Sequence, residues 1–306
     1  MNKIIVIVGP TASGKTDLSI KIAKEFNGEC INADSTQIFK GTDIATNKIT
    51  TQEMQGIKHH LLSIKEVNES YSVAEFQKHA REKIAKVLEN EKTPILIGGT
   101  GLYINSVLMD YNFSSDDHID NYAKKYDTKS NQEIWEVLNL KDSLEAKKIH
   151  MNNRYRLIRA LELIQLTGIT KTKLTKDNKK YLYNNLLIIG ISAKREELYS
   201  KINNRVLSLI EKGLFEEIQL AYKANNFDKK AQSLKCIGGP EIIKYFEKEI
   251  DYEKCIELMQ QNNRHYARRQ LTWFKNQLNN VKWFEHDYKN FEDISNEIIE
   301  YIRSNL

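Results

Sequence analysis

The chain has 306 residues, with 46 lysines and arginines against 41 aspartates and glutamates, and a formal net charge of +5. This length suits one large α/β domain or a domain with a sizeable insert, and so mild a positive charge does not by itself imply a nucleic-acid partner. Cys30, Cys236 and Cys255 lack C-x-x-C spacing, which argues against a disulfide framework or a zinc site and for a reducing compartment. Because no apolar stretch reaches membrane-spanning length and the first apolar run ends at Gly9-Pro10, we expect a cytoplasmic protein that does not bind a membrane.

The first predicted strand, residues 4–8, leads directly into the segment GPTASGKT at residues 9–16. Its spacing fits the phosphate-cradling P-loop, G-x-x-x-x-G-K-[ST]. Gly9 and Gly14 let successive backbone N–H groups turn inward, Lys15 adds a positive charge, and Thr16 supplies a hydroxyl that suits Mg²⁺. The predicted polyphosphate site consists of Gly9, Pro10, Thr11, Ala12, Ser13, Gly14, Lys15 and Thr16. The pattern leaves open whether a phosphoryl group is transferred, hydrolysed or held as a leaving group.

Helices and strands alternate in the segment that follows. Apolar residues at helical spacing cover residues 17–26, a second strand covers 29–33, and a Ser-x-x-Glu capping box at 72–75 begins a helix that continues to residue 91. A further strand, 94–97, stops at the sequence GGTG before another helix. This alternation predicts an α/β fold, a P-loop NTPase-like parallel sheet flanked by helices. Ligands on such sheets bind at the carboxyl ends of the strands, so the P-loop, Asp34 and Thr100 should meet in one cleft.

Asp34 and Thr100 each follow one of these strands, and each admits more than one role. The Asp34 carboxylate could hold Mg²⁺ through water or accept a proton from a nucleophile; the alternative is a helix or turn cap, since Asp-Ser is a common capping pair. The Thr100 hydroxyl could bond a phosphate oxygen or a base, and the alternative is a tight turn. The strand before Gly98 ends without the acid that many P-loop ATPases carry, which weakens a hydrolase interpretation.

A polar helical stretch interrupts the alternation. We predict that residues 111–183 form a helical insert, and that residues 1–110 together with 184–306 form the P-loop catalytic core with a helical C-terminal part. The chain returns to the sheet at 186–192, and a late edge strand is expected near 281–284.

Two basic features suit an RNA backbone, but each equally suits a solvated helix face. The segment 264–275 places arginines and aromatic residues side by side with no acid, and Arg156 and Arg159 share a helix face with Glu162. The adjacent pair His59-His60 favours a structural role over metal binding, because neighbours on a strand point apart.

Eight segments, in this order along the chain, resemble the tRNA dimethylallyltransferase family. They are GPTASGKT (9–16), NADSTQIFKGTDIAT (32–46), GIKHHLLSI (56–64), YSVAEFQKHA (71–80), PILIGGTGLYI (94–104), NNRYRLIRALELIQLTG (152–168), INNRVLSLIEKGLFEEIQLA (202–221) and RHYARRQLTWFK (264–275). The similarity runs from about residue 3 to 285, and the ordered set is far more specific than any single motif. The chain departs from the family where the usual DIGTAKP reads DIATNKI (43–49) and where the usual Gln is Tyr155.

The resemblance implies a reaction and a set of site residues. This family prenylates N6 of the adenosine just 3′ of the anticodon, position 37, in tRNAs that read codons beginning with U; dimethylallyl diphosphate is the donor and diphosphate is released. By resemblance Asp34 is the base with Thr100 close to it, while Lys15, Thr16, Mg²⁺ and Arg205 face the diphosphate. The implied tRNA contacts are Asp34, Ser35, Thr36, Gln37, Thr100, Tyr155, Arg156, Leu157, Ile158, Arg159, Arg264 and Arg268.

We therefore expect a monomeric transferase whose partners are the tRNA anticodon stem-loop and dimethylallyl diphosphate, with Mg²⁺ as cofactor. One alternative is an ATP-dependent small-molecule kinase, which would use Lys15 and Thr16 in the same way. The other is a tRNA-binding module that lacks catalysis. The basic segment at 264–275 and the absence of an acidic residue after the strand 94–97 favour an RNA-modifying enzyme over the kinase. The presence of Asp34 favours an enzyme over the binding module.

Overall fold

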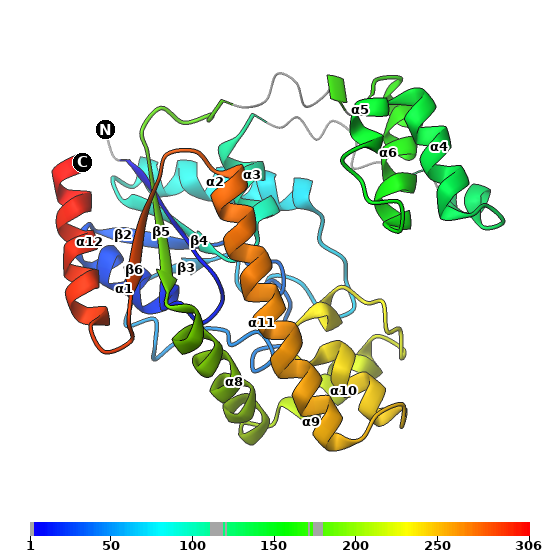
Figure 1. The fold of residues 1–306 in the computed structure, drawn as a ribbon. Helices are drawn as coiled ribbons and strands as arrows, with labels where there is room; N and C mark the ends of the chain where they lie inside the picture. Colours follow the sequence, from blue (N-terminus) through cyan, green and yellow to red (C-terminus); the bar gives the residue numbers. More distant parts are fainter. Residues whose placement is uncertain (1–2, 111–118, 120, 171, 174–179) are drawn as a thin grey trace. The chain divides into compact units, whose positions relative to one another are not determined.

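The computed structural model describes residues 3–110, 119, 121–170, 172–173 and 180–306 (Figure 1). The chain divides into two compact units, one made of Met1–Val107 with Tyr183–Leu306 and the other of Leu108–Leu182. Residues 111–118, 120, 171 and 174–179 of the predicted insert lie outside the described residues.

The first unit is built on a six-stranded sheet with the strand order β3-β2-β4-β1-β5-β6. Every pairing is parallel, as the alternation of strands and helices predicts. The strands are β1 (Ile4–Val8), β2 (Gly28–Asn32), β3 (His59–His60), β4 (Thr93–Gly98), β5 (Leu186–Ala193) and β6 (Val281–His286). The predicted edge strand is therefore confirmed, and it continues two residues beyond the expected range.

Apolar residues from the central strands meet α1 (Lys15–Glu25) and α12 (Phe291–Asn305) on one face of this sheet. Successive side chains of a strand point to opposite faces, and β1 is buried along its whole length, so the continuous run of branched residues fits a strand covered on both sides. The buried residues of this cluster include Ile5, Ile7, Leu18, Ile22, Ile189, Ile191, Ile298 and Ile302.

Two further helices of this unit are α2 (Val73–Glu89), which contacts β2 and β4, and α3 (Gly101–Leu108). The predicted capping box begins α2: the Ser72 hydroxyl accepts from the Glu75 backbone N–H at 3.1 Å, and the Glu75 carboxylate accepts from the Ser72 N–H at 2.8 Å. These two bonds satisfy N–H groups that would otherwise lack a partner at the start of the helix.

A second apolar core forms where the C-terminal helices pack together. Its helices are α8 (Arg195–Glu211), α9 (Leu214–Ala224), α10 (Gly239–Phe246) and α11 (Tyr252–Gln277), with the short η2 (Ser233–Lys235). The buried residues include Val206, Leu214, Ile218, Ile242 and Met259. This core supports α11 against α8, which matters because α11 reaches the carboxyl ends of the strands.

The second unit contains η1 (Tyr122–Tyr126), α4 (Asn131–Lys141), α5 (Ser143–Ala146) and α6 (Arg154–Thr167). It has an apolar core of its own, made by Tyr122, Ile134, Leu138, Ala146, Ile149, Leu157, Ala160 and Leu161. Asn153 caps α6 through a bond from the Arg156 N–H to its side chain, and Gly168 ends the helix in the left-handed conformation, with a φ of 67°.

Two expectations about the whole chain can be compared with the described residues. Cys30, Cys236 and Cys255 are all buried and free. Among the helices of the described ranges, we find none with the length and apolar character needed to cross a membrane.

Candidate active site

The P-loop turns between β1 and α1 and is fixed by protein atoms on its outer side. A Cβ added at Gly9 would lie 2.3 Å from the Ile191 carbonyl oxygen, so only glycine fits between the two strands. Gly14, with a φ of 83°, precedes α1 in a conformation that favours glycine, and a Cβ there would meet the Phe291 ring at 2.5 Å. The local sequence thus forms the predicted loop.

His286, the last residue of β6, and Tyr288 just after it hold two carbonyl groups of this loop. The His286 ring nitrogen Nε2 lies 3.0 Å from the Ser13 carbonyl oxygen, and the Tyr288 hydroxyl donates to the Ala12 carbonyl oxygen at 2.9 Å. These contacts hold the Ala12 and Ser13 carbonyl groups, while the Thr11 N–H donates to Gln270 and the Ser13 N–H donates to the Pro10 carbonyl oxygen at 3.4 Å. The Ser13 hydroxyl is buried and lacks a hydrogen-bond partner among the described residues, which is the condition of a group prepared for an additional partner.

Lys15 lies half-buried in the loop, and none of the ion pairs among the described residues joins its ammonium to a carboxylate. Its ammonium donates to the Pro10 carbonyl oxygen at 2.7 Å. Burial lowers the pKa of Lys15 from 10.5 to about 7; the negative charge of Asp34 opposes this shift, and the positive charge of Arg205 adds to it. A bound anion would supply the compensating charge that the free protein lacks.

Arg205, on α8, adds a second cation to the same loop. Its Nη1 donates to the Thr11 hydroxyl at 3.3 Å. Burial is the main cause that lowers the pKa of Arg205, although Tyr288 and Asp17 act in the opposite direction. Two half-buried cations beside the glycine-rich loop and the start of α1 suit a polyanion such as diphosphate.

Asp34 follows β2 and closes a small turn with half of its carboxylate. Its Oδ1 accepts from the Thr36 backbone N–H at 2.9 Å and from the Thr36 hydroxyl at 2.7 Å, while the Asp34 N–H donates to Asn32 Oδ1 at 3.2 Å. The capping interpretation is therefore correct for Oδ1. None of the hydrogen bonds among the described residues uses Oδ2, so that oxygen remains for a metal or a proton.

Thr100 joins the loop after β4 to the loop after β2. Its hydroxyl accepts from the Ser35 N–H at 3.0 Å and donates to the Ser35 hydroxyl at 3.2 Å, and its own N–H donates to the Ala33 carbonyl oxygen at 3.2 Å. The structure therefore brings Asp34, Ser35 and Thr100 together with the P-loop, as the topology predicts.

The glycines around Thr100 fit against the protein itself. A Cβ at Gly98 would lie 2.2 Å from the Ala33 carbonyl oxygen, and one at Gly101 would lie 2.1 Å from the Trp273 ring. These two glycines permit close packing of the loop against Ala33 and of α3 against Trp273.

Sequence reasoning missed the buried face of α11, which contributes Gln270 and Tyr266. Gln270 is 5% exposed; its Oε1 accepts from the Thr11 N–H at 2.8 Å, and its Nε2 donates to the Gly99 carbonyl oxygen at 3.0 Å. Tyr266, one turn earlier, interacts with Thr100 and Gln270; burial first, and then the charge of Asp34, raise the pKa of its hydroxyl. The helical spacing of Asn263, Ala267, Gln270 and Phe274, all buried, was the available signal.

The two arginines predicted on α11 differ in their surroundings. Arg264 donates to Asn203 Oδ1 at 2.6 Å and so links α11 to α8. Arg268 is exposed and lines a surface hollow along α11. The other residues that line this hollow are His265, Arg269, Thr272, Trp273, Asn276 and Gln277. Cations, an indole and amides in one hollow suit a strand of RNA.

The predicted contacts on α6 lie in the second unit, and they also differ from one another. Tyr155 is 74% exposed and Arg156 is exposed, whereas Ile158 is half-buried. The side chain of Leu157 is fully buried in the core of this unit, so any RNA contact by Leu157 would have to use its backbone. Arg159 forms the salt bridge to Glu162, with Nη1 and Oε2 2.7 Å apart.

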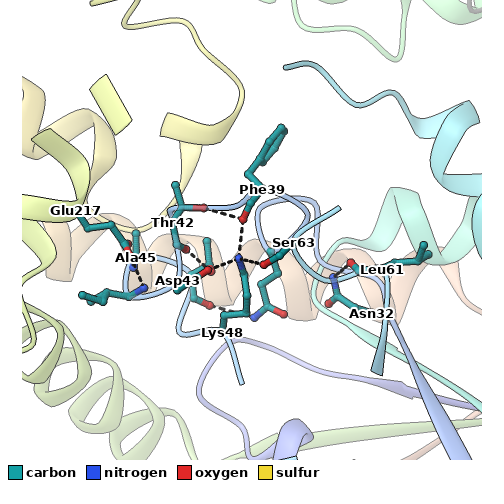
Figure 2. Close-up of polar contacts among 12 residues, drawn as sticks. Asn32, Phe39, Thr42, Asp43, Ala45, Lys48, Leu61, Ser63 and Glu217 are labelled. Carbon is teal, nitrogen blue, oxygen red and sulfur yellow. Dashed lines mark hydrogen bonds and ion pairs between the residues drawn. The ribbon is translucent and has the colours of Figure 1, made fainter. Parts of the chain in front are cut away.

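The segment after Gln37 is held in place by one buried ammonium group, that of Lys48 (Figure 2). Lys48 Nζ donates to the Phe39 carbonyl oxygen at 2.6 Å, to the Ser63 hydroxyl at 2.9 Å and to the Asp43 carboxylate. The Lys48 side chain is only 6% exposed, so its three donor hydrogens are satisfied inside the protein. Lys48 is retained in the DIATNKI segment that departs from the family sequence.

Glu217 of α9 holds the same segment from the other side. Its two carboxylate oxygens accept from the Ile44 N–H at 2.9 Å and the Ala45 N–H at 2.7 Å. Gln37 in turn donates to the Thr46 carbonyl oxygen at 3.1 Å. The predicted tRNA contact Gln37 is therefore tied to a segment that the Lys48 ammonium and the Glu217 carboxylate hold in place.

The adjacent histidines have the structural role that the sequence favours. His60 Nε2 lies 2.6 Å from Glu29 Oε2, and His59 Nδ1 lies 2.9 Å from the Ile57 carbonyl oxygen. Within the described ranges, we find no group of three or more His, Cys, Asp or Glu side chains placed to hold a metal.

Comparison with known proteins decides between the kinase and the tRNA-modifying interpretations. The family model described as IPP transferase matches residues 37–277. The chain belongs to the tRNA dimethylallyltransferase family. It is 46% identical to the tRNA dimethylallyltransferase of Anoxybacillus flavithermus over 98% of this chain and 96% of that protein. The enzyme of the same name from Bacillus subtilis is 41% identical over 92% and 90% of the two chains.

Solved structures of the family share the fold. The tRNA isopentenylpyrophosphate transferase of Bacillus halodurans matches with a TM-score of 0.75 at 38% identity, over 100% of this chain and 97% of that one. A eukaryotic dimethylallyltransferase acting on tRNA matches with a TM-score of 0.84 at 28% identity, over 100% and 79%. The predicted fold class and family are thereby confirmed, and family membership favours a leaving-group role for the P-loop.

Proposed function

We propose that this protein transfers a dimethylallyl group from dimethylallyl diphosphate to N6 of adenosine 37, just 3′ of the anticodon, in tRNAs that read codons beginning with U. The observation that carries the proposal is the position of Asp34 beside a P-loop that has two half-buried cations, Lys15 and Arg205. Thr100 hydrogen-bonds Ser35 in the loop of Asp34, and Gln270 links Gly99, the residue before Thr100, to Thr11 of the P-loop. Prenyl transfer needs an anion site for the leaving diphosphate and, beside it, a carboxylate that can accept the proton of the nucleophile.

In the proposed reaction the bond between the allylic carbon and the bridging oxygen breaks, and that carbon bonds to adenine N6. Asp34 accepts the proton that N6 loses. The electron pair of the broken bond leaves with diphosphate, whose growing charge is stabilised by Lys15, Arg205 and the P-loop N–H groups. No phosphoryl group moves, which agrees with the end of β4, where Gly98 and Gly99 stand in place of an acid.

The residues present fit a Mg²⁺ ion at the diphosphate. The buried Ser13 hydroxyl has no hydrogen-bond partner within the described part of the chain, and Thr16 places a second hydroxyl at the start of α1. Mg²⁺ takes oxygen ligands, keeps several waters and uses substrate phosphates to complete its shell. We propose that Thr16 holds the ion, directly or through water, and that the bound ion would neutralise charge on the leaving group.

tRNA binding is assigned to the arginines of α11 and to the exposed residues of α6. Adenosine 37 must leave the stacked anticodon loop to reach Asp34, and enzymes that modify a base do so by flipping it. The contacts at Ser35, Thr36, Gln37, Tyr155, Arg156 and Ile158 belong to this proposal, as do a cytoplasmic location and a monomeric state.

Mass spectrometry of tRNA nucleosides tests the function. The purified protein, incubated with unmodified tRNA, dimethylallyl diphosphate and Mg²⁺, should yield prenylated adenosine and release one diphosphate for each modified nucleoside. A matched anticodon stem-loop with guanosine at position 37 should remain unmodified. Conversion of ATP to ADP without any prenylated adenosine would support the kinase and contradict the proposal.

A further inference from the structure

The side chain of Gln270 joins two loops that serve different substrates. Thr11 belongs to the loop that holds the diphosphate, and its backbone N–H donates to Gln270 Oε1 at 2.8 Å. Gly99 directly precedes Thr100 on the acceptor side, and its carbonyl oxygen accepts from Gln270 Nε2 at 3.0 Å. The orientation of the amide is determined by these partners, because an N–H can only donate and a carbonyl can only accept.

Gln270 has little freedom to adopt another position. It is 5% exposed, and a Cβ at Gly99 would come within 2.3 Å of its Nε2, so the backbone of Gly99 packs directly against the amide. Neighbouring side chains of α11 are fixed as well: Ala267 and Phe274 are buried on the same face. The amide is thus a rigid spacer carried by a helix of 26 residues.

From this geometry we infer that Gln270 is a positioning residue that sets the distance between the leaving diphosphate and the adenine N6. The inference rests on the proposed function. Displacement at carbon requires the nucleophile, carbon and leaving group to be aligned with the reacting atoms about 3–3.5 Å apart, and an error of about 1 Å can cost about 10²-fold in rate. Neither substrate needs Gln270 in order to bind, because each half of the site has its own ligands.

The first test is a neutral replacement of similar length, Gln270→Met. This change removes both hydrogen bonds, so the side chain no longer links the P-loop to the loop after β4. We expect kcat to fall about 10²-fold, while KM for dimethylallyl diphosphate and for tRNA changes by less than about threefold. Titration of the free protein with diphosphate, and separately with an anticodon stem-loop, should give affinities close to those of the wild type.

The second test is Gln270→Glu, which keeps the shape but replaces the donor to Gly99 by an acceptor. Protonation of the introduced carboxyl restores an O–H donor. The ratio of the variant rate to the wild-type rate should therefore rise as the pH falls, and taking this ratio at each pH removes the titration of the groups that both proteins share. Tyr266 interacts with Gln270 directly, and the other titratable or charged groups around it and the P-loop are Asp34, Arg269, Lys15 and Arg205. Gln261→Glu is the matched control, because Gln261 is an exposed residue of the same helix, and its rate ratio should stay flat near one.

Three outcomes would overturn the inference. A Gln270→Met rate within about threefold of wild type would make the residue a packing element only. Loss of affinity for one substrate in proportion to the loss of rate would place Gln270 in that half-site. A lower melting temperature with an unchanged rate per folded molecule would show a purely structural role. If the wild type itself forms no prenylated adenosine, the proposed function fails first, whereas failure of the inference leaves the wild-type and Gln261→Glu rates intact.

Discussion

Removal of the catalytic-site cation Lys15 should make the free protein more stable. Burial lowers the pKa of this ammonium from 10.5 to about 7. At about 1.36 kcal/mol for each pKa unit, the charged form is disfavoured in the folded protein by about 5 kcal/mol. The hydrogen bond to the Pro10 carbonyl oxygen, which a variant would lose, is worth about 1 kcal/mol. Lys15→Met should therefore raise the free energy of unfolding near pH 6 by up to about 4 kcal/mol.

The gain should depend on pH in a defined direction. The folded pKa lies below the unfolded one, so between about pH 7 and about pH 10.5 the unfolded chain binds more protons, and wild-type stability rises with pH. Below this window Lys15 is charged in both states and the full penalty applies. The stability difference between Lys15→Met and wild type should thus be largest below about pH 7 and shrink as the pH approaches about 10.5.

Urea unfolding at several pH values measures this difference directly. The buffers must lack phosphate, because an anion bound to the folded state would stabilise the wild type by mass action. Lys24→Met is the matched control, since Lys24 is an exposed lysine of the same helix and should change stability by no more than about 0.5 kcal/mol at any pH. A Lys15→Met protein that is less stable than wild type at pH 6, by the same amount as at pH 9, would refute the reasoning.

Three further changes test other parts of the site. Asp34→Asn should lower kcat by about 10²–10⁴-fold with little effect on tRNA affinity. Single-turnover rates across a Mg²⁺ titration check this prediction. Added metal would restore the rate if Asp34 only held the ion, and a near wild-type rate would show that Asp34 is only a cap. Arg268→Ala should weaken tRNA binding and flatten the log–log salt dependence by about 0.7–0.9, whereas Arg303→Ala, in a surface salt bridge on α12, should leave the slope unchanged; equal slopes would make Arg268 an ordinary surface residue. Lys48→Met should destabilise the protein by about 1–3 kcal/mol in urea unfolding, because the Asp43 carboxylate loses its ammonium partner and the Phe39 carbonyl oxygen keeps only the 3.5 Å hydrogen bond from the Thr42 hydroxyl. Lys40→Met, at an exposed lysine of the same segment, should cost less than about 1 kcal/mol.

Asp34 has the turn-capping role that the sequence offered as the alternative to a base, and this cap is compatible with the proposed base. One carboxylate oxygen closes the turn to Thr36, and the other remains without a hydrogen bond among the described residues. The turn orients the carboxylate while leaving one lone-pair face open, so the cap supports the proposed base. Asp34→Asn should consequently preserve the turn, because the amide oxygen can still accept from Thr36.

The sequence by itself determined the features that depend on neighbours along the chain. The P-loop follows from glycine spacing between an apolar run and a helix, the start of α2 follows from Ser72 and Glu75, and the parallel sheet follows from alternating helices and strands. The convergence of Asp34 and Thr100 was predictable too, because the carboxyl ends of parallel strands share one edge of a sheet.

Only the tertiary structure decided which polar side chains complete the site. Gln270 and Thr11 are 259 positions apart, and Tyr288 and Ala12 are 276 apart, yet each pair is hydrogen-bonded. In the sequence Gln270 lies within a basic segment whose charges suggested an exposed face, but Gln270 points inward while Arg268 points outward. The same division on α6 buries Leu157 and exposes Tyr155. The local sequence around a polar residue does not show whether its hydrogen bonds go to water or to a distant backbone group. For Gln270, the packing of α11 against the carboxyl ends of the strands determines that the partners are backbone groups.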